Sequence, residues 1–434
     1  MERKHASTMT RQFKRSFSEE TLNELGKMAR FCRRERVVTP FRLALCLIES
    51  FSTGSVKCIA DIQRAFNALC ESAVCYKPFH NQLAKRQFPI FVRLLLSRLL
   101  NELACEVLRF TPSSPFARFP HIRIQDGTSF ALKSTLAETF PGRFTTISPA
   151  AVELHVDLDM MSETINQVVL SPDSSAERQF LPDVEEVQGG LLLGDRGYFS
   201  RAYLRSLDQA GGFFIVRATT AINPLIVQAI GPDGQELKHF RNKRLKDVAG
   251  KLSRFEHLDM KVRFPCAGGP LDCRLVVHPN VRKDNTARYL VTNLEPEAFT
   301  PQHVSDGYRL RWQVELLFKE WKSHANLHAF DTSNPHIAEG LIWASLCAAT
   351  VKRYCAHMTQ LVFGVAVSTQ TAAKCIHHVL GDVFAALMHD PRRVSRCVKR
   401  TLTYLASNAQ RARPGRDRRT GRLKLGLEHI YGAA

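Results

Sequence analysis

The sequence predicts a mixed α/β protein with helices at both ends. Residues 1 to about 115 carry apolar residues at helical spacing and few strand signals. From residue 121 onward the apolar residues alternate, as they do in strands with one buried face. The continuous apolar run GGLLLGD, at 189–195, is typical of a strand buried on both faces. Together these observations favour a three-layer α/β core behind a helical amino-terminal domain.

The amino-terminal domain, 1–115, is predicted from two helical segments. TPFRLALCLIESF, at 39–51, begins with a capping-type Thr and a Pro in the first turn, followed by an apolar stripe. FPIFVRLLLSRLLNELACEVLRF, at 88–110, reads as one long apolar helix. The three prolines of TPSSPFARFP, at 111–120, then end the helical region and indicate a domain boundary.

The core is expected in two parts, 116–221 and 301–365, separated by a β-rich insertion at 222–300. Alternation predicts strands at 121–132, 150–159 and 164–172, and Ser174 with Glu177 has the capping-box spacing that begins a helix. After the strand at 189–195 we expect a helix at 201–211 and a strand at 212–219.

The insertion and the last two regions complete the predicted plan. The insertion contributes strands at 258–264, 271–278 and 288–294, and the last is expected to return to the main sheet. Helices at 308–322 and 334–355 complete the core. The remaining residues, 366–434, form a helical, basic carboxy-terminal region.

The charge of the chain points to a polyanionic partner. Sixty Lys and Arg against 41 Asp and Glu leave a net charge of +19, which suits nucleic acid, although a ribosomal or membrane-surface protein would give the same number. The excess gathers at the ends: ten bases against five acids in 1–40, and twelve against two in 391–434. The basic tail is either a disordered, solubilising end or a contact to the DNA backbone.

Cysteines and hydropathy favour a soluble, cytoplasmic protein. The twelve cysteines are scattered, with no C-x-x-C pair and no zinc-like spacing, which is typical of reduced thiols. The start MERKHASTMTRQFKR is too polar for a signal peptide. No apolar run approaches the roughly 20 residues that a membrane-spanning helix needs.

The expected helix at 308–322 has two contrasting faces. One face is polar, with spacings of 3, 4 and 7 residues: Tyr308, Arg311, Glu315 and Lys322. The opposite face is apolar and should join the core: Leu310, Val314, Leu317 and Trp321. Glu320 points elsewhere. Taken alone, the polar column is equally typical of a solvated face with an Arg–Glu pair four residues apart.

Two aspartates on predicted strands give this column a possible partner. Asp126 continues the inward-facing set of its strand, where a charge requires a partner or a metal ion. Asp195 ends the buried apolar run, at the strand edge where α/β proteins commonly bind ligands, although an Asp there can simply begin a turn. With Glu315 they would form a carboxylate cluster suited to Mg²⁺ or Mn²⁺.

The segments QDGTSF, GDRGYFS and YRLRWQVELLFKEWK together resemble the DDE transposases of the insertion-sequence-four family. The family's signature Y-x2-R-x3-E-x6-K is matched in full by Tyr308, Arg311, Glu315 and Lys322. DRGY at 195–198 matches its second acidic motif and DGT at 126–128 its first. The 120 residues between Asp195 and Glu315 fit the family's β-rich insertion.

The resemblance implies an RNase H-like fold in which Asp126, Asp195 and Glu315 bind two Mg²⁺ ions, with Mn²⁺ as a substitute. Such an enzyme nicks DNA at the element end and uses the freed 3′ hydroxyl to attack the opposite strand and then target DNA. Arg196, Tyr308, Arg311 and Lys322 would hold DNA phosphates. The resemblance also implies terminal inverted repeats as the bound DNA, a homodimeric synaptic complex and a nucleoid-associated location in a bacterium.

Several alternatives stay open at this point. Some family members stack a flipped base on a Trp of the insertion, but the three tryptophans here lie outside it: Trp312, Trp321 and Trp343. A hairpin intermediate is therefore not predicted either way. Rival functions are a captured transposase kept as a DNA-binding regulator, and a nuclease without strand transfer.

Three further motifs carry residue types that are found at binding sites. ELHVDLD aligns four ligand-type side chains on one strand face, for which strict alternation favours a solvated face: Glu153, His155, Asp157 and Asp159. His377 and His378 are adjacent and should diverge on a helix, which argues against a ligand pair. The basic run NKRLK, at 242–246, could contact either DNA or water.

Overall fold

The computed structural model describes residues 2–32, 37–53, 56–278, 287–324, 331–411 and 424–430 of the 434. Its helices are α1 Glu2–Ser16, α2 Glu19–Met28, α3 Pro40–Thr53, α4 Ile59–Leu69, α5 Tyr76–Leu83, α6 Gln87–Glu102, α7 Arg201–Gln209, α8 Leu245–Leu252, α9 Pro301–Arg309, α10 Trp312–His324, α11 Pro335–Phe363, α12 Thr369–Cys375, α13 His377–His389 and α14 Val394–Asn408. Its strands are β1 Leu108–Phe110, β2 Ile122–Ala131, β3 Ala151–Asp159, β4 Thr164–Pro172, β5 Leu191–Gly194, β6 Phe213–Ala218, β7 Leu225–Ile230, β8 Leu258–Phe264, β9 Leu271–His278, β10 Arg288–Thr292 and β11 Leu427–His429.

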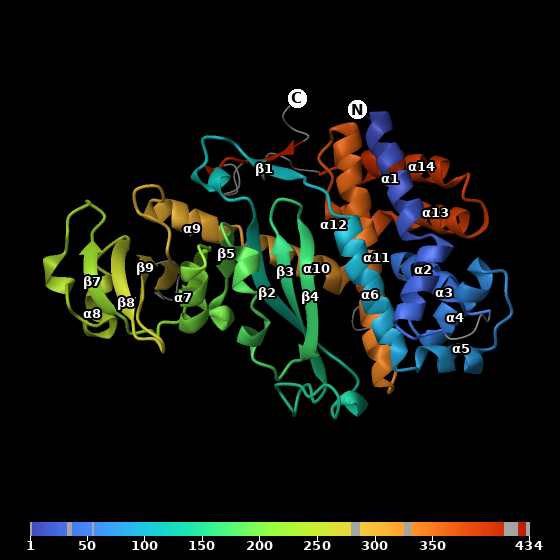
Figure 1. Ribbon diagram of the computed structural model, residues 1–434, viewed down its shortest axis with the longest axis horizontal. Helices are drawn as coiled ribbons and strands as arrows, with labels where there is room; N and C mark the ends of the chain where they lie inside the picture. The colour runs from blue at the N-terminus through green and yellow to red at the C-terminus, as the bar shows by residue number, and fades with distance from the viewer. Residues whose placement is uncertain are drawn as a thin grey trace.

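A nine-stranded mixed sheet organises the α/β part of the molecule (Figure 1). Its order is β4-β3-β2-β5-β6-β10-β9-β8-β7. Strand β2 pairs antiparallel with β3 and parallel with β5, and β5 pairs parallel with β6. The prediction of a mixed sheet is confirmed, as is the return of the last strand of the insertion, because β10 pairs with both β6 and β9. The insertion therefore extends the sheet, and its apolar side chains share a second core cluster with residues of β5, α7 and β6.

The helices of both chain ends form one bundle beside the sheet (Figure 1). The 29-residue helix α11 runs through it and packs against α1, α3, α6 and α14. Most of its residues are buried, and most of the buried ones are apolar, which explains why the amino-terminal helices gather around it. The bundle and the adjoining sheet share a continuous apolar core.

Two of the helices predicted before residue 190 differ from the structure. Helix α6 ends at Glu102, and Leu108–Phe110 form strand β1, paired antiparallel with β11. This strand has only three residues, in the pattern buried, exposed, buried, and it follows a long apolar segment. Its sequence therefore resembles the end of that helix. The helix expected after Ser174 is wrong too, because residues 177–180 and 184–187 form separate 3₁₀ turns. Pro182 lies between them and keeps Leu181 in an extended conformation.

The structure describes no helix that is both long and apolar enough to cross a bilayer. All twelve cysteines carry free thiols, and several are deeply buried. Burial raises the pKa of the Cys46 and Cys347 thiols, so these side chains act as small apolar groups of the core.

Candidate active site

The two predicted aspartates lie side by side on neighbouring strands. In the parallel pair β2–β5, Gln125 stands opposite Gly194, and each is followed directly by one of the aspartates, Asp126 and Asp195. Strands in a sheet are about 4.8 Å apart, so the two backbones are close at this point. Asp195 follows the last residue of β5 and begins a 3₁₀ turn at Arg196.

The acid of the third motif reaches the aspartates on helix α10, which packs against β2. One continuous helix was predicted from Tyr308, but α9 ends at Arg309 and α10 begins at Trp312. Between the two helices, backbone N–H groups donate hydrogen bonds to the carbonyl three residues earlier, which gives a tighter, 3₁₀-type turn. One example is the bond from the Arg311 N–H to the Tyr308 carbonyl at 3.1 Å. The predicted apolar stripe is confirmed as buried: Leu310, Val314, Leu317 and Trp321.

Two side chains of the signature tie the three acids together. The Arg311 guanidinium donates to Asp126 and, at 2.5 Å, to Glu315. The Tyr308 hydroxyl donates to Asp195 Oδ1 at 3.0 Å. Five of the seven predicted site residues therefore meet in one place, although the sequence separates Asp126 from Glu315 by almost half of the chain.

The electrostatics of the site show an excess of negative charge. Burial, together with the nearby Asp195 and Glu315 carboxylates, raises the pKa of Asp126 to about 6, against the opposing effect of Arg311. Burial alone would lower the pKa of Arg311, but Asp126 and its neighbours raise it instead. Burial and Asp195 likewise raise the pKa of Tyr308, which keeps its hydroxyl proton. The Arg311 guanidinium pairs with two of the three carboxylates, and the Tyr308 hydroxyl donates to the third.

The other two predicted residues lie at the edge of the site. Arg196 and Lys322 are exposed, and within the described residues neither side chain makes a hydrogen bond or an ion pair. A residue that the sequence analysis missed is closer: Arg217 Nη1 lies 3.9 Å from Asp195 Oδ1. The indication in the sequence was that Arg217 is a basic residue on strand β6, which lies next to β5 and runs parallel to it.

The donor set suits a hard divalent cation, because carboxylate oxygens are the ligands that Mg²⁺ and Mn²⁺ prefer. As the side chains stand, no group of three or more His, Cys, Asp or Glu residues in the described ranges is arranged to hold an ion. Between Asp126 and Glu315 lies the Arg311 guanidinium, a cation that satisfies both. Metal binding at these acids therefore requires that Arg311 move.

The expectation of a solvated face on β3 is wrong. Glu153, His155 and Asp157 are all at most 6% exposed, because residues 173–187 cover this face of the sheet. The His155 ring stacks on Phe180 with centroids 3.8 Å apart and hydrogen-bonds the Tyr198 hydroxyl at 3.1 Å. Burial lowers the pKa of His155 to about 4, so the imidazole is neutral.

This buried polar layer braces the acidic motifs from behind the sheet. A Cβ on Gly127, next to Asp126, would lie 2.5 Å from Glu153 Oε1 and 3.1 Å from the Tyr198 hydroxyl. Glycine at this position thus allows Glu153 and Tyr198 to approach the strand that bears Asp126. The layer explains the glycine of the DGT motif and the tyrosine of the DRGY motif by packing.

Glu320, the rival acid of the same helix, lies outside the site. It is buried and accepts a hydrogen bond from Arg353 at 3.0 Å. Arg353 also pairs with Glu163, which gives a second buried cluster of one guanidinium and two carboxylates. This confirms that Glu320 points away from the column of Glu315.

A mixed sheet that sets two aspartates side by side, faced by a helix-borne glutamate, is typical of enzymes that cut and join phosphodiester bonds. Residues 117–351, more than half of the chain, match the family described as "Transposase DDE domain", and the chain belongs to that family. The resemblance found in the sequence is thereby confirmed.

Relatives match along most of the chain at low identity. The transposase for insertion sequence element IS231C of Bacillus thuringiensis subsp. berliner is 22% identical over 90% of this chain and 89% of its own length. The transposase for insertion sequence element IS1151 of Clostridium perfringens is 21% identical over 73% of each chain. Among solved structures, a piggyBac transposase synaptic complex with hairpin DNA matches with a TM-score of 0.45 and 12% identity, covering 93% of this chain and 86% of that chain.

Proposed function

We propose that this protein is the transposase of a bacterial insertion sequence. It would bind the terminal inverted repeats, cut DNA at the element ends and join the 3′ hydroxyl ends to target DNA. The observation that carries the proposal is the convergence of Asp126, Asp195 and Glu315, linked by Tyr308 and Arg311, in a chain of the DDE family. The strand order β4-β3-β2-β5-β6, with only the last three strands mutually parallel, supports an RNase H-like core.

The three acids would hold two Mg²⁺ ions, with Mn²⁺ as a substitute, and Asp126 would be the ligand shared by both. When bound, the ions activate a water or hydroxyl nucleophile and stabilise the leaving oxygen of the phosphodiester. Asp126 suits a central place because it is the most buried of the three acids and lies between the other two elements. Tyr308 fixes the carboxylate of Asp195 through its hydrogen bond.

The cationic side chains around the acids would hold DNA phosphates. Lys322 follows Glu315 by seven residues, about 10 Å along α10, and Arg196 follows Asp195 directly. Both are exposed and their charges face solvent, where phosphate oxygens can reach them. Arg311, once released from the carboxylates, and Tyr308 would complete this set.

The remaining features of the proposal concern the assembly. The amino-terminal helices would bind the terminal inverted repeats, and a homodimer would pair the two element ends in the synaptic complex. The protein would act on DNA in the cytoplasm, at the bacterial nucleoid. Its proposed partners are therefore terminal-repeat DNA, target DNA and a second copy of the chain.

The test is cleavage of labelled DNA that carries the flanking terminal repeats, with Mg²⁺ or Mn²⁺. Wild type should nick at the repeat end only with metal, and Glu315→Gln should abolish nicking while repeat binding persists. Glu320→Gln, on the same helix but outside the site, is the matched control and should still cleave once its fold is verified by circular dichroism. Repeat binding without cleavage by wild type would indicate a captured regulator, and cleavage without joining would indicate a nuclease.

A further inference from the structure

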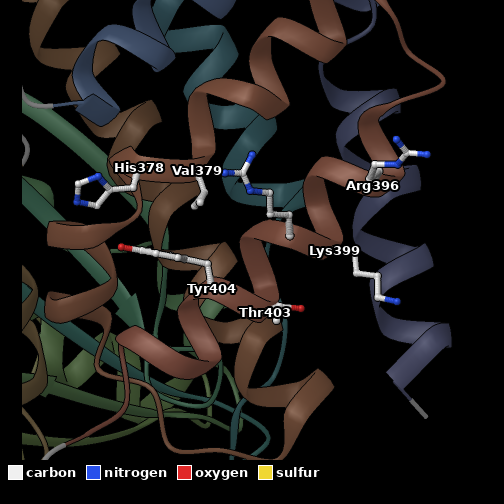
Figure 2. A pocket seen from close by; sticks show the side chains of 7 residues that line it. His378, Val379, Arg396, Lys399, Thr403 and Tyr404 are labelled. Carbon is white, nitrogen blue, oxygen red and sulfur yellow. The ribbon is translucent and has the colours of Figure 1, made fainter.

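The carboxy-terminal helices form a hollowed, basic surface that the candidate active site does not use. An open hollow of about 760 Å³ lies between α13 and α14 (Figure 2). The view shows His378 and Tyr404 at one end, with Arg396 and Lys399 at the other. We call the polar lining the carboxy-terminal basic surface: His378, Arg396, Lys399, Arg400, Thr403 and Tyr404.

The positive charge of this surface has little internal compensation. Helix α14 contains three bases and no acid, and the bases are three and four residues apart, so they share one face. Like charges four residues apart cost roughly 0.2–0.5 kcal/mol per pair. Arg400 is paired with Asp382 at 2.5 Å, whereas Arg396 and Lys399 make no ion pair within the ranges that the structure describes. This helix therefore carries an unfavourable charge that an anionic partner would relieve.

The basic amino-terminal helix lies beside this surface. Helix α1 packs against α14, and Figure 1 shows the two next to each other at one end of the molecule. Exposed bases of α1 are also three and four residues apart: Arg11, Lys14 and Arg15. Two basic helices from opposite ends of the sequence thus lie side by side, and of these three bases of α1 only Arg15 has an ion pair among the described residues, with Glu102.

The carboxy-terminal basic surface is connected to the helix of Glu315 through helix α12. Helix α12 packs against both α10, which carries Glu315, and α14. A single helix therefore separates the helix of Glu315 from the helix that carries Arg396 and Lys399.

We propose that the carboxy-terminal basic surface binds the phosphodiester backbone of duplex DNA. Arg396 and Lys399 would contact phosphate oxygens, and His378 and Tyr404 would add hydrogen-bond donors. Binding would be independent of sequence, because the contacts go to phosphates. The inference rests on the proposed function for DNA as the substrate.

The test measures binding of the full chain to a 30-base-pair duplex without terminal repeats or metal, by fluorescence anisotropy between 50 and 200 mM salt. The variant is Arg396→Ala/Lys399→Ala. Losing two phosphate contacts should reduce the slope of log K against log salt by about 1.8 and weaken binding roughly 10- to 60-fold at 0.1 M salt. The matched control is Lys251→Ala/Arg254→Ala, which removes the same charge from exposed positions in the insertion.

An unchanged slope in the α14 variant, or an equal reduction in the control, would overturn the proposal. So would unchanged DNA binding with a loss of self-association in sedimentation, since the surface would then bind a second copy of the chain. The outcome is separate from that of the proposed function. If wild type cleaves at the repeats but the salt slope of Arg396→Ala/Lys399→Ala is unchanged, only the role of this surface is rejected. If the slope is reduced but wild type does not cleave, only the catalytic proposal is rejected.

Discussion

Replacing Arg311 with Ala should destabilise the metal-free protein and make its stability depend on divalent cations. Arg311 is 14% exposed and pairs with Asp126, at 15%, and Glu315, at 31%. Removing one partner of a buried pair costs about 3–5 kcal/mol. Because Glu315 is partly solvated, we expect a loss of roughly 2–3 kcal/mol in the free energy of unfolding.

The lost charge can be replaced by a cation that binds the same carboxylates. For a dissociation constant of about 0.1–1 mM, 10 mM Mg²⁺ or Ca²⁺ would restore roughly 1.4–2.7 kcal/mol. Urea unfolding in EDTA and in 10 mM metal measures both quantities. Wild type should gain less from metal than Arg311→Ala, because in wild type the ion must first displace the guanidinium.

Arg353→Ala is the matched control for this experiment. Arg353 is 12% exposed and also bridges two buried acids, Glu320 and Glu163, but outside the site. The Arg353→Ala substitution should lower the free energy of unfolding by a similar amount. Adding metal should raise the stability of this variant no more than it raises that of wild type. Equal metal gains in the two variants, or none in Arg311→Ala, would refute the reasoning that the three acids form a cation site.

Three further outcomes test the surroundings of the acids. Burial and Glu177 raise the pKa of Glu153 to about 7, above its value near 4.3 in the unfolded chain. Between about pH 4.3 and pH 7 the folded protein therefore binds more protons than the unfolded chain, and its stability falls as the pH rises through this window. Glu153→Gln should therefore stabilise the protein by about 1–3 kcal/mol at pH 8 and much less at pH 5, in urea unfolding at both pH values. Tyr308→Phe should cost about 1–3 kcal/mol by removing the donor to Asp195, and a neutral result would mean that this bond does not form in solution. Gly127→Ala should cost about 1–3 kcal/mol, less so when combined with Glu153→Ala; additive losses would contradict the close approach of the two side chains.

The sheet and the convergence of the site could be predicted because both follow from short-range patterns. Alternation located β2, β3 and β4 almost to the residue, and β8 and β9 without error. The spacing of Tyr308, Arg311 and Glu315 placed them near each other even though the helix is broken between the first two. Spacing sufficed because residues three apart, such as Tyr308 and Arg311, lie on the same side of a 3₁₀-type turn.

The buried face of β3 could not be predicted, because its cover comes from elsewhere in the chain. Strict alternation of polar and apolar residues is the same for a solvated face and for one covered by polar partners. Here residues 173–187 supply those partners, including Phe180 over His155. The same segment was expected to be a helix, so its role as a lid of 3₁₀ turns was not foreseeable. Arg217 was missed for a related reason, since its link to Asp195 depends on strand order.

Arg311 connects the two chemical tasks of the proposed function. In the structure its guanidinium neutralises Asp126 and Glu315, which limits the repulsion among three acids in one partly buried place. On the proposed function the same side chain holds a DNA phosphate, and it cannot fully satisfy both partners at once. Cations that take over the carboxylates free Arg311 for DNA, and DNA that attracts Arg311 exposes the carboxylates to cations. By linkage each ligand then increases the affinity for the other. The three carboxylates would therefore bind metal ions most tightly when DNA with a phosphodiester to be cut is bound.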